Sequence, residues 1–275
     1  MQYFVNVWTI IFMKILLNIR TFIYEINHLD ELKYHRNIKE FFKKKLIFLL
    51  VKVFYKYSDI VAANSKETSI ELSNYTKKKV ITIYNPCFEK IINKKRKYKK
   101  NTKLKILNIA RLTEQKDQLT ILKAINNSNF KNKIKLTIVG FGHLKIKLLN
   151  YIKKKKIDCE IIENKTSLKY YYSNNDLFVF SSIYEGLPTT MVEAASYCMP
   201  IISSNFRSGS KEILCSGKGG SIYKIKDHNK LSKLIDNFYK YPTFFYKKEI
   251  ICRKNLIKYS VKQNLKLFNN ILKKI

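Results

Sequence analysis

The chain has 275 residues, 46% of them apolar, and carries 54 lysines and arginines against 20 acidic residues, a formal net charge of +34. This length and apolar share supply a hydrophobic core and exclude a disordered tail. Glycine and proline number only 7 and 4, which excludes collagen-like and linker-type sequences. The five cysteines form no C-x-x-C pair, so neither a disulfide framework nor a zinc site is indicated.

The positive charge is spread along the whole chain. Only six of the 54 basic residues are arginine, whereas clustered arginines with aromatic platforms are typical of a dedicated nucleic-acid groove. We therefore interpret the lysines mainly as the compositional bias of an AT-rich genome and expect no specific nucleic-acid partner. A net charge of this size also favours contact with an anionic membrane surface.

Two apolar segments near the amino terminus have an open interpretation. Tyr3 to Met13 is uncharged, has no basic residue before it and is interrupted by Lys14. It therefore favours a buried or interfacial helix over a secretory signal or a spanning helix of ~20 residues. Residues 41–57 interleave lysines with apolar residues. They predict either a helix lying on an anionic bilayer or a helix packed on a sheet with snorkelling lysines.

Further along the chain, short strand-like runs alternate with helix-like stretches. The expected strands are residues 21–26, 59–63, 80–84, 104–109, 135–139, 159–162, 177–180 and 200–203, and the expected helices include 117–127, 144–155 and 190–197. Continuous apolar runs suit parallel sheets buried on both faces, so this order predicts an α/β protein of doubly wound units. After Ile222 the composition predicts helices broken at Pro242.

Three features of the second unit suggest chemistry at strand ends. Arg111 and Lys116 follow the strand 104–109, and two cations at the carboxyl end of a parallel strand suit a diphosphate, although both residues are also plausible as ordinary surface charges. Gly140 and Gly142 follow the next strand at a turn into a helix, where amide groups favour anions. A G-x-G alone is more typical of a turn than of a cofactor site.

The third feature is a pair of carboxylates, Glu185 and Glu193, that follows the strand 177–180. Glu185 falls in the loop and Glu193 about one turn inside the helix expected from Thr190, so both are placed to face one cleft. The alternative is a capping box between Thr190 and Glu193 with Glu185 as a loop charge. A cap explains Glu193 but leaves Glu185 and the helix-start amides unexplained.

These residues resemble the carboxyl-terminal half of glycosyltransferase family 4, which has the GT-B fold. The resemblance runs from Val80 to about Ile235 and is carried by VITIYNP, NIARLTEQKDQLTILKAI, LTIVGFGHLKIKLL, NDLFVFSSIYEGLPTTMVEAASYCMPIISS and SGSKEIL, in family order and spacing. The E-x7-E motif of the family is met by Glu185 and Glu193. The resemblance implies two Rossmann-like units, the first truncated.

The resemblance also implies a division of the chain. It assigns residues 1–90 to an incomplete acceptor-side α/β domain, 91–103 to a basic linker, and 104–240 to the nucleotide-sugar-binding domain. Residues 241–275 would be terminal helices that pack back on the first domain. Two departures from the family are Ala110 in place of the usual glycine and the residues Asn205 to Glu212 in place of a glycine-rich stretch.

Carried over residue by residue, the resemblance implies retaining transfer of a hexosyl or N-acetylhexosaminyl group from a nucleotide-sugar donor, with a UDP-sugar favoured and no metal required. Arg111 and Lys116 would hold the diphosphate, Glu185 and His28 would contact the donor sugar, and Glu193 would bind the ribose. The donor-binding set is Arg111, Lys116, Gly140, Gly142, Glu185, Gly186, Leu187, Pro188, Thr189, Thr190 and Glu193. A lone histidine after a strand, as His28 is, is also typical of a structural role.

The acceptor implied by the resemblance is a cell-surface polysaccharide, such as capsule or lipopolysaccharide, or a lipid-linked glycan. The expected location is cytoplasmic, at the inner face of the plasma membrane. Two alternatives remain: a catalytically idle, truncated relative that binds the donor only, or a basic module that binds membranes or nucleic acid.

Overall fold

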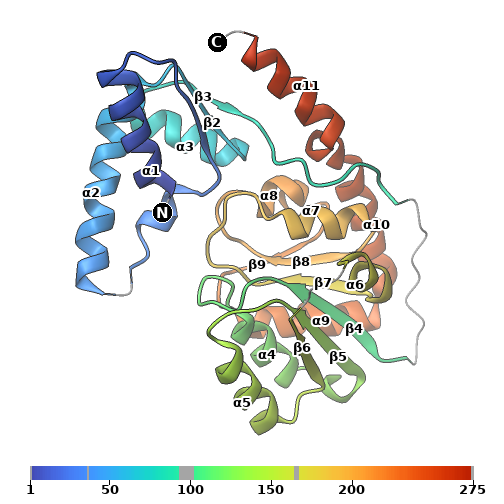
Figure 1. Cartoon of the computed structure of the whole chain (residues 1–275). Helices are drawn as coiled ribbons and strands as arrows, with labels where there is room; N and C mark the ends of the chain where they lie inside the picture. Colours follow the sequence, from blue (N-terminus) through green and yellow to red (C-terminus); the bar gives the residue numbers. More distant parts are fainter. Residues whose placement is uncertain (1, 36, 93–101, 164–166, 274–275) are drawn as a thin grey trace.

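The computed structural model describes residues 2–35, 37–92, 102–163 and 167–273, and these form two parallel β-sheets with helices around them (Figure 1). The first sheet has the order β1-β2-β3, with β1 (Phe22–Glu25), β2 (Ile60–Ala63) and β3 (Val80–Thr82). The second has the order β6-β5-β4-β7-β8-β9, with β4 (Leu104–Ile109), β5 (Ile134–Val139), β6 (Cys159–Ile162), β7 (Leu177–Phe180), β8 (Ile201–Ser204) and β9 (Ser221–Tyr223). The predicted α/β class and all eight predicted strands are confirmed, and β9 is additional.

The second sheet is buried on both faces because alternate residues of each strand enter different cores. Leu177 and Val179 of β7 pack with α4 (Gln118–Asn126), α5 (Lys145–Lys155) and α9 (His228–Lys240). Phe178 and Phe180 pack on the other side with α7 (Thr189–Ser196) and α8 (Ser210–Ile213), beside α6 (Lys169–Asn174). This two-sided burial explains why the strands are continuous apolar runs.

The first unit places its helices mainly on one side of a three-stranded sheet. These are α1 (Gln2–Thr9), which continues as a π-helical turn over Ile10–Leu16, α2 (Ile38–Phe54) and α3 (Lys66–Thr76). Ile23 and Val61 of the sheet share a core with Ile47 and Val51 of α2. The segment expected to be a buried or interfacial helix therefore does form a helix, and one side of it is buried.

The side of β1 that does not pair with β2 is covered by the first residue of α1. The Gln2 side chain donates to the Tyr24 carbonyl at 2.5 Å and accepts from the Ile26 amide at 3.3 Å. It thereby satisfies two backbone groups that an edge strand otherwise leaves to solvent or to another chain.

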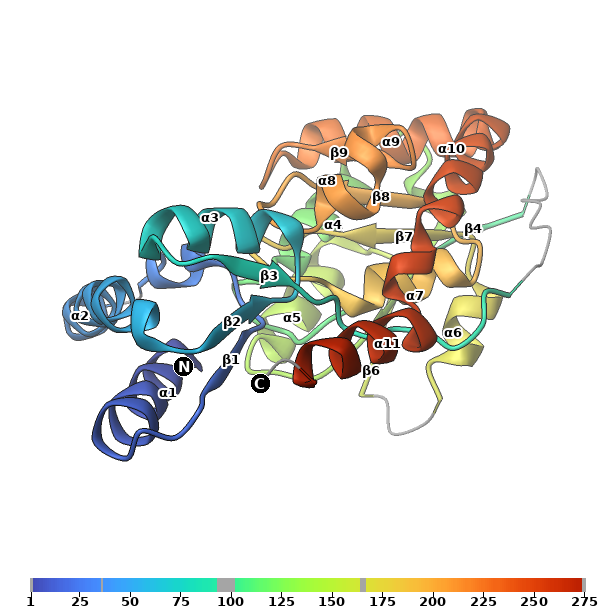
Figure 2. The same ribbon diagram turned by 90° about the horizontal axis from the view of Figure 1, so that it is seen from above.

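The carboxyl-terminal helices lie on both units. Pro242 ends α9 and is the first residue of α10 (Pro242–Lys254), because its fixed φ and missing N–H suit a helix start. Helix α10 contacts α7 and α9. Helix α11 (Val261–Leu272) crosses to the first sheet (Figure 2). There the Phe268 ring meets the Phe22 ring of β1 edge to face, with ring centres 5.7 Å apart. The domain boundaries stay a prediction, and residues 93–101 of the predicted linker lie outside the described residues.

No helix in the described part of the chain combines the length and the apolar character needed to cross a bilayer.

Candidate active site

Three neighbouring strands of the second sheet end where the predicted site residues begin. Strand β4 lies between β5 and β7, and the loops after these strands carry Arg111, Gly140 and Glu185. Because all three strands are parallel, their carboxyl ends meet at one edge of the sheet. The first unit faces this edge.

The loop after β4 and the loop after β7 are joined by an ion pair between Lys116 and Glu185. The Lys116 ammonium contacts the Glu185 carboxylate, and the two side chains are only 13% and 10% exposed. The Lys116 ammonium also lies 5.8 Å from the ring centre of Phe180. The pair lies at the carboxyl ends of parallel strands, where open α/β sheets bind their ligands.

Hydrogen bonds fix the two loops so that this pair stays together. The Ser181 hydroxyl donates to the Lys116 carbonyl at 2.7 Å, and the Gln115 amide group donates to the Tyr184 carbonyl at 2.8 Å. The backbone amide of Ile183 donates to the Gln115 carbonyl at 2.8 Å. The charged side chains are therefore held by backbone contacts on both sides.

Arg111 is an exposed residue that begins the same loop and acts on the first unit. Burial raises the pKa of Glu31, and the positive charges of Lys44 and Arg111 act against this rise. An exposed arginine at the carboxyl end of β4 is accessible to an anionic ligand.

Gly140 and Gly142 have a packing role that is evident from the backbone. Both have positive φ, +154° and +150°, and a Cβ atom would lie 2.0 Å from the Ala110 carbonyl oxygen and 2.5 Å from the Leu112 carbonyl oxygen. Only glycine fits this close approach between the loops after β4 and β5. Both glycines therefore pack directly against the backbone of the loop that carries Arg111.

The segment from Gly186 to Thr190 links the two units and starts helix α7. A Cβ atom on Gly186 would lie 1.8 Å from the Ile26 carbonyl oxygen, so the β7 loop packs directly on the end of β1. Leu187 is buried, and Pro188 is the N-cap of α7, whose first residues are Thr189 and Thr190. The side chain of Pro188 makes no cap, so the first amides of α7 are available for an anion.

Glu193 has surroundings different from those of Glu185. Its carboxylate accepts a hydrogen bond from the Tyr172 hydroxyl at 2.7 Å. Burial raises the pKa of Glu193, and the hydrogen bond from Tyr172 acts in the opposite direction. The capping box between Thr190 and Glu193 is not formed among the described residues, because Pro188 is the N-cap and α7 begins at Thr189.

The Glu193 side chain lines a cavity of about 600 Å³ between α6, α7 and the segment after β3. Residues of all three elements contribute, including Cys87, Leu168, Tyr172 and Tyr197. Described contacts do not join Glu185 to Glu193, because the first pairs with Lys116 and the second with Tyr172. The placement of both carboxylates on one cleft stays a prediction.

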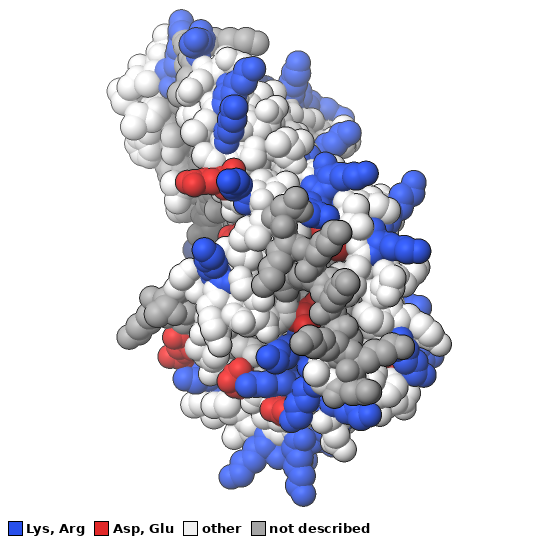
Figure 3. Space-filling view, turned by 90° about the vertical axis from the view of Figure 1, so that its right-hand side faces the viewer, with Lys and Arg blue, Asp and Glu red and all other residues white. Residues whose placement is uncertain are grey.

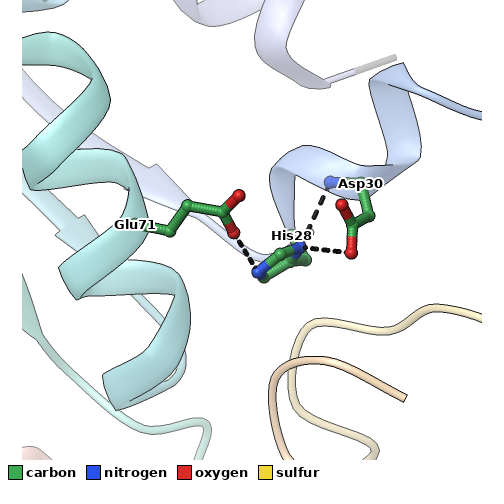
Figure 4. A group of neighbouring side chains, drawn as sticks. All are labelled: His28, Asp30 and Glu71. Atoms are coloured by element: carbon green, nitrogen blue, oxygen red, sulfur yellow. Dashed lines mark hydrogen bonds and ion pairs between the residues drawn. The ribbon is translucent and has the colours of Figure 1, made fainter.

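His28 lies at the end of the first unit's β1 and is held between two carboxylates (Figure 4). Its Nε2 contacts Glu71 of α3, its Nδ1 lies 3.3 Å from Asp30, and the residue is 1% exposed. Burial alone would lower the pKa of His28, but the Asp30 and Glu71 carboxylates raise it to about 9. With both ring nitrogens engaged, this geometry supports the structural role of His28.

Two cations extend the His28 cluster, one of them from the second unit. Lys33 lies 2.7 Å from Asp30, and Arg207 lies 3.8 Å from Asp30 and 3.7 Å from Glu71. The ligand atoms of His28, Asp30 and Glu71 lie within 4.8 Å of one another, a spacing that a metal ion can bridge. The neighbouring ammonium and guanidinium groups already balance these carboxylates, so the donor set does not require a metal.

Sequence reasoning missed the residues that hold the two units together. Arg207 joins the His28 cluster, the Ser208 amide donates to the Glu67 carboxylate at 2.8 Å, and the Ser208 hydroxyl donates to the Gly186 carbonyl at 2.9 Å. Between the two units, the Tyr34 and Tyr184 rings stack with centres 4.8 Å apart. In all but the Gly186 contact, these partners are more than 130 residues apart, so no local pattern reveals them.

The surface is basic well beyond the site. On the face drawn in Figure 3, lysines and arginines are distributed over both units and acidic side chains are few. The basic residues do not gather in one stripe on that face, in agreement with the even distribution along the sequence. Charge alone therefore marks no nucleic-acid groove there.

Comparison with known proteins identifies the family. The family model described as "Glycosyl transferases group 1" matches residues 89–263, which is more than half of the chain. An uncharacterized glycosyltransferase of Methanocaldococcus jannaschii is 34% identical over 192 residues, covering 64% of this chain and 47% of the relative. An alpha-1,4-N-acetyl-D-galactosaminyltransferase of Campylobacter jejuni, named for an undecaprenol-diphosphate-linked glycan, is 25% identical over 205 residues, covering 74% of this chain and 56% of the relative. The chain thus spans about half the length of these curated relatives.

Solved structures agree with the sequence relatives on the fold. HepE of Anabaena, in a complex with UDP and glucose, matches with a TM-score of 0.80 over 100% of this chain and 77% of HepE, at 11% identity. TarM matches with a TM-score of 0.72 over 92% of this chain and 50% of TarM, at 20% identity. At such identities the likeness concerns the fold alone, and it confirms the predicted GT-B-like arrangement of two α/β units.

Proposed function

The chain belongs to the glycosyl transferases of group 1, and from this membership we propose that it moves a sugar from a nucleotide-diphosphate donor to a glycan or lipid-linked acceptor. The observation that carries the proposal is the Lys116–Glu185 pair at the edge where β4, β5 and β7 end. It brings a cation and a carboxylate together at one edge of the sheet, which supports the roles proposed for them. The proposal includes membership of glycosyltransferase family 4 and retention of the anomeric configuration.

In this proposal the diphosphate of the donor lies between Arg111, Lys116 and the start of α7. Arg111 is exposed after β4, and α7 begins at Thr189 after the neighbouring strand β7. These groups supply positive charge where negative charge grows as the diphosphate leaves. A metal ion is then not required, and the expected donor is a UDP-sugar.

The reaction would break the bond between the sugar C1 and the β-phosphate oxygen, and its electron pair would go to the diphosphate. A hydroxyl oxygen of the acceptor would form the new bond to C1 and release its proton to the departing diphosphate. The centre at C1 is oxocarbenium-like during this exchange. In the donor complex, Lys116 would pair with the diphosphate instead of with Glu185. The Glu185 carboxylate would then be free to face the donor sugar.

Glu193 is proposed to bind the ribose of the donor nucleotide. The Tyr172 hydroxyl orients the carboxylate through a hydrogen bond of 2.7 Å, which leaves the other carboxylate oxygen for a ribose hydroxyl. The adjoining cavity of about 600 Å³, lined by Leu168 and Tyr197, provides space beside the Glu193 carboxylate. Gly140, Gly142 and Gly186 contribute by allowing the loops to approach.

The proposed acceptor class follows from the relatives. The name of the Campylobacter jejuni relative gives a glycan on undecaprenol diphosphate, and another relative, from Escherichia coli, is named an O-antigen biosynthesis glycosyltransferase. We propose a hexosyl or N-acetylhexosaminyl transfer onto such a surface glycan or lipid-linked intermediate at the inner face of the plasma membrane. The alternative proposal is a donor-binding protein without turnover.

The test is release of UDP from a panel of UDP-sugars by the wild-type chain and by Lys116→Gln, with a lipid-linked glycan as acceptor. Lys105→Gln is the matched control, because Lys105 is an exposed lysine near the opposite end of β4. We expect Lys116→Gln to lower the turnover number by roughly 10²- to 10³-fold, and Lys105→Gln to leave it unchanged. Turnover that survives in Lys116→Gln would contradict the assignment of this lysine.

A further inference from the structure

The outer surface of the first unit carries an apolar face on α1, the turn after it and α2. We define the α1–α2 face by Trp8, Phe12, Leu16, Phe42, Leu46 and Leu49, each of which is between 42% and 64% exposed. Soluble proteins rarely leave so many large apolar side chains together in water. The two helices lie side by side at the edge of the molecule in both ribbon views (Figures 1 and 2).

Helix α2 is apolar on both sides, although only one side is covered. Ile47 and Val51 are buried against the first sheet, whereas Leu46 and Leu49 on the other side are exposed. The outward side of a surface helix is expected to be charged or polar, and the large apolar residues between the lysines of α2 depart from this pattern. The outer side of α2 therefore exposes apolar side chains that the described part of the chain does not cover.

Helix α1 extends this surface through aromatic contacts. The Trp8 ring stacks on Phe12 with centres 5.4 Å apart, and the Phe4 ring meets Trp8 edge to face at 6.0 Å. The Lys43 ammonium of α2 lies 5.8 Å from the Phe4 ring centre, so the two helices present one continuous surface. Aromatic rings with lysines around them are typical of helices that lie in a membrane interface.

The charge of this surface identifies its partner. Helix α2 carries exposed lysines at Lys39, Lys43, Lys45 and Lys52, and among the described residues none of these four forms an ion pair. Its single acidic residue, Glu40, pairs with Lys44 at 3.0 Å. A second copy of the chain would bring like charges together, whereas an anionic bilayer offers both an apolar interior and opposite charge.

We propose that the α1–α2 face docks the protein on anionic lipid bilayers, with both helices lying in the interface rather than crossing it. The orientation suits the site, because α2 starts four residues after Tyr34, whose ring stacks on Tyr184 next to Glu185. Docking would bring the loop that carries Glu185 close to a lipid-linked acceptor. This purpose rests on the proposed function, but the docking itself does not.

The experiment uses Trp8, the only tryptophan of the chain. The full-length protein is titrated with phosphatidylcholine vesicles that contain either no anionic lipid or one quarter phosphatidylglycerol, with and without brominated acyl chains. We expect the Trp8 emission to shift to shorter wavelength and to be quenched by brominated chains with the anionic vesicles only. Binding without any change in Trp8 emission would overturn the proposal, since the protein would then bind through another surface.

Two triple variants test the charge argument without altering the apolar residues. Lys43→Gln, Lys45→Gln and Lys52→Gln together are expected to weaken partitioning on the order of 100-fold, because each lysine near an anionic surface contributes comparably. The control replaces the exposed Lys153, Lys154 and Lys155 of α5 by Gln, which removes equal charge from the other unit. Equal loss in both variants would overturn the proposal in favour of general charge attraction.

Other occupants of the face give different results. A dimer in sedimentation velocity that already protects Trp8 without lipid would assign the face to a second copy and overturn membrane docking. A protein that binds vesicles through Trp8 but releases no UDP would support docking and contradict the proposed transfer. Turnover on a soluble acceptor without vesicle binding would contradict docking alone.

Discussion

The ion-pair cluster around His28 predicts a stability that falls as the pH rises. His28 has a pKa of about 9 in the folded chain against 6.5 for an ordinary histidine, a difference of about 2.5 units. At about 1.36 kcal/mol per unit, the protonated side chain contributes at most about 3 kcal/mol to the free energy of unfolding, because the Asp30 amide, 3.1 Å from Nδ1, favours the neutral ring. Because the folded pKa is the higher one, this contribution is complete below pH 6.5 and is lost as the pH rises through about 9.

The assay is urea unfolding between pH 6 and pH 10, followed by Trp8 fluorescence in the same unit. The destabilisation of His28→Gln relative to the wild type should be larger at pH 6 than at pH 10 by at most about 3 kcal/mol, the part that depends on protonation. His143→Gln is the control, because His143 pairs with Glu114 at the exposed surface. A His28→Gln variant whose stability falls with pH as steeply as that of the wild type would refute the reasoning.

Three further predictions concern the cleft. Glu185→Gln should lower turnover by roughly 10²-fold or more, while the affinity for UDP stays within a factor of two or so. UDP release measures the turnover and calorimetry measures the affinity. Undiminished turnover would contradict the role of Glu185 at the sugar. Gly186→Ala should weaken the contact between the units, because a Cβ would lie 1.8 Å from the Ile26 carbonyl oxygen; faster proteolysis between the units is expected, and an unchanged rate would contradict it. Tyr172→Phe should raise the pKa of Glu193 further, because it removes the hydrogen bond that acts to lower it; a carboxyl titration by NMR that does not move would count against this cause.

The fold was largely predictable because both sheets are parallel. Buried parallel strands are continuous apolar runs, and each predicted strand agrees with the structure to within about two residues, as for the expected 104–109 and the observed β4 (Leu104–Ile109). Strand β9 (Ser221–Tyr223) was missed because it has three residues at the sheet edge and begins with a serine. The start of α7 at Thr189 rather than Thr190 follows from Pro188, which acts as the N-cap.

The candidate site was predictable only where it depends on the ends of strands. Arg111, Lys116 and Glu185 come directly after β4 and β7, so topology places them at one edge. The ion pair between Lys116 and Glu185 depends on how two loops pack, and the contacts of Arg207 with the first unit depend on how the units meet. Such partners are distant in the sequence and leave no periodic signal.

The contacts of His28 were also not predictable from the sequence pattern. The resemblance implied that it contacts the donor sugar, and this role stays a prediction. Its neighbours Asp30 and Glu71 come from a 3₁₀ turn and from α3, and together they engage both ring nitrogens. A pairing between residues 28 and 71 arises from the packing of α3 on the sheet, which the sequence pattern alone does not specify.

The central claim, a nucleotide-sugar site built on Lys116, Glu185 and Glu193, is tested most directly by calorimetric titration of the purified chain with UDP in EDTA. Glu193→Ala is measured beside the control Asp158→Ala. Asp158 precedes β6, and its exposed carboxylate pairs with Lys103. We expect metal-independent binding that Glu193→Ala weakens by roughly 1 to 3 kcal/mol and that Asp158→Ala leaves unchanged. A folded wild-type chain that binds no UDP, or two variants that bind alike, would contradict the account.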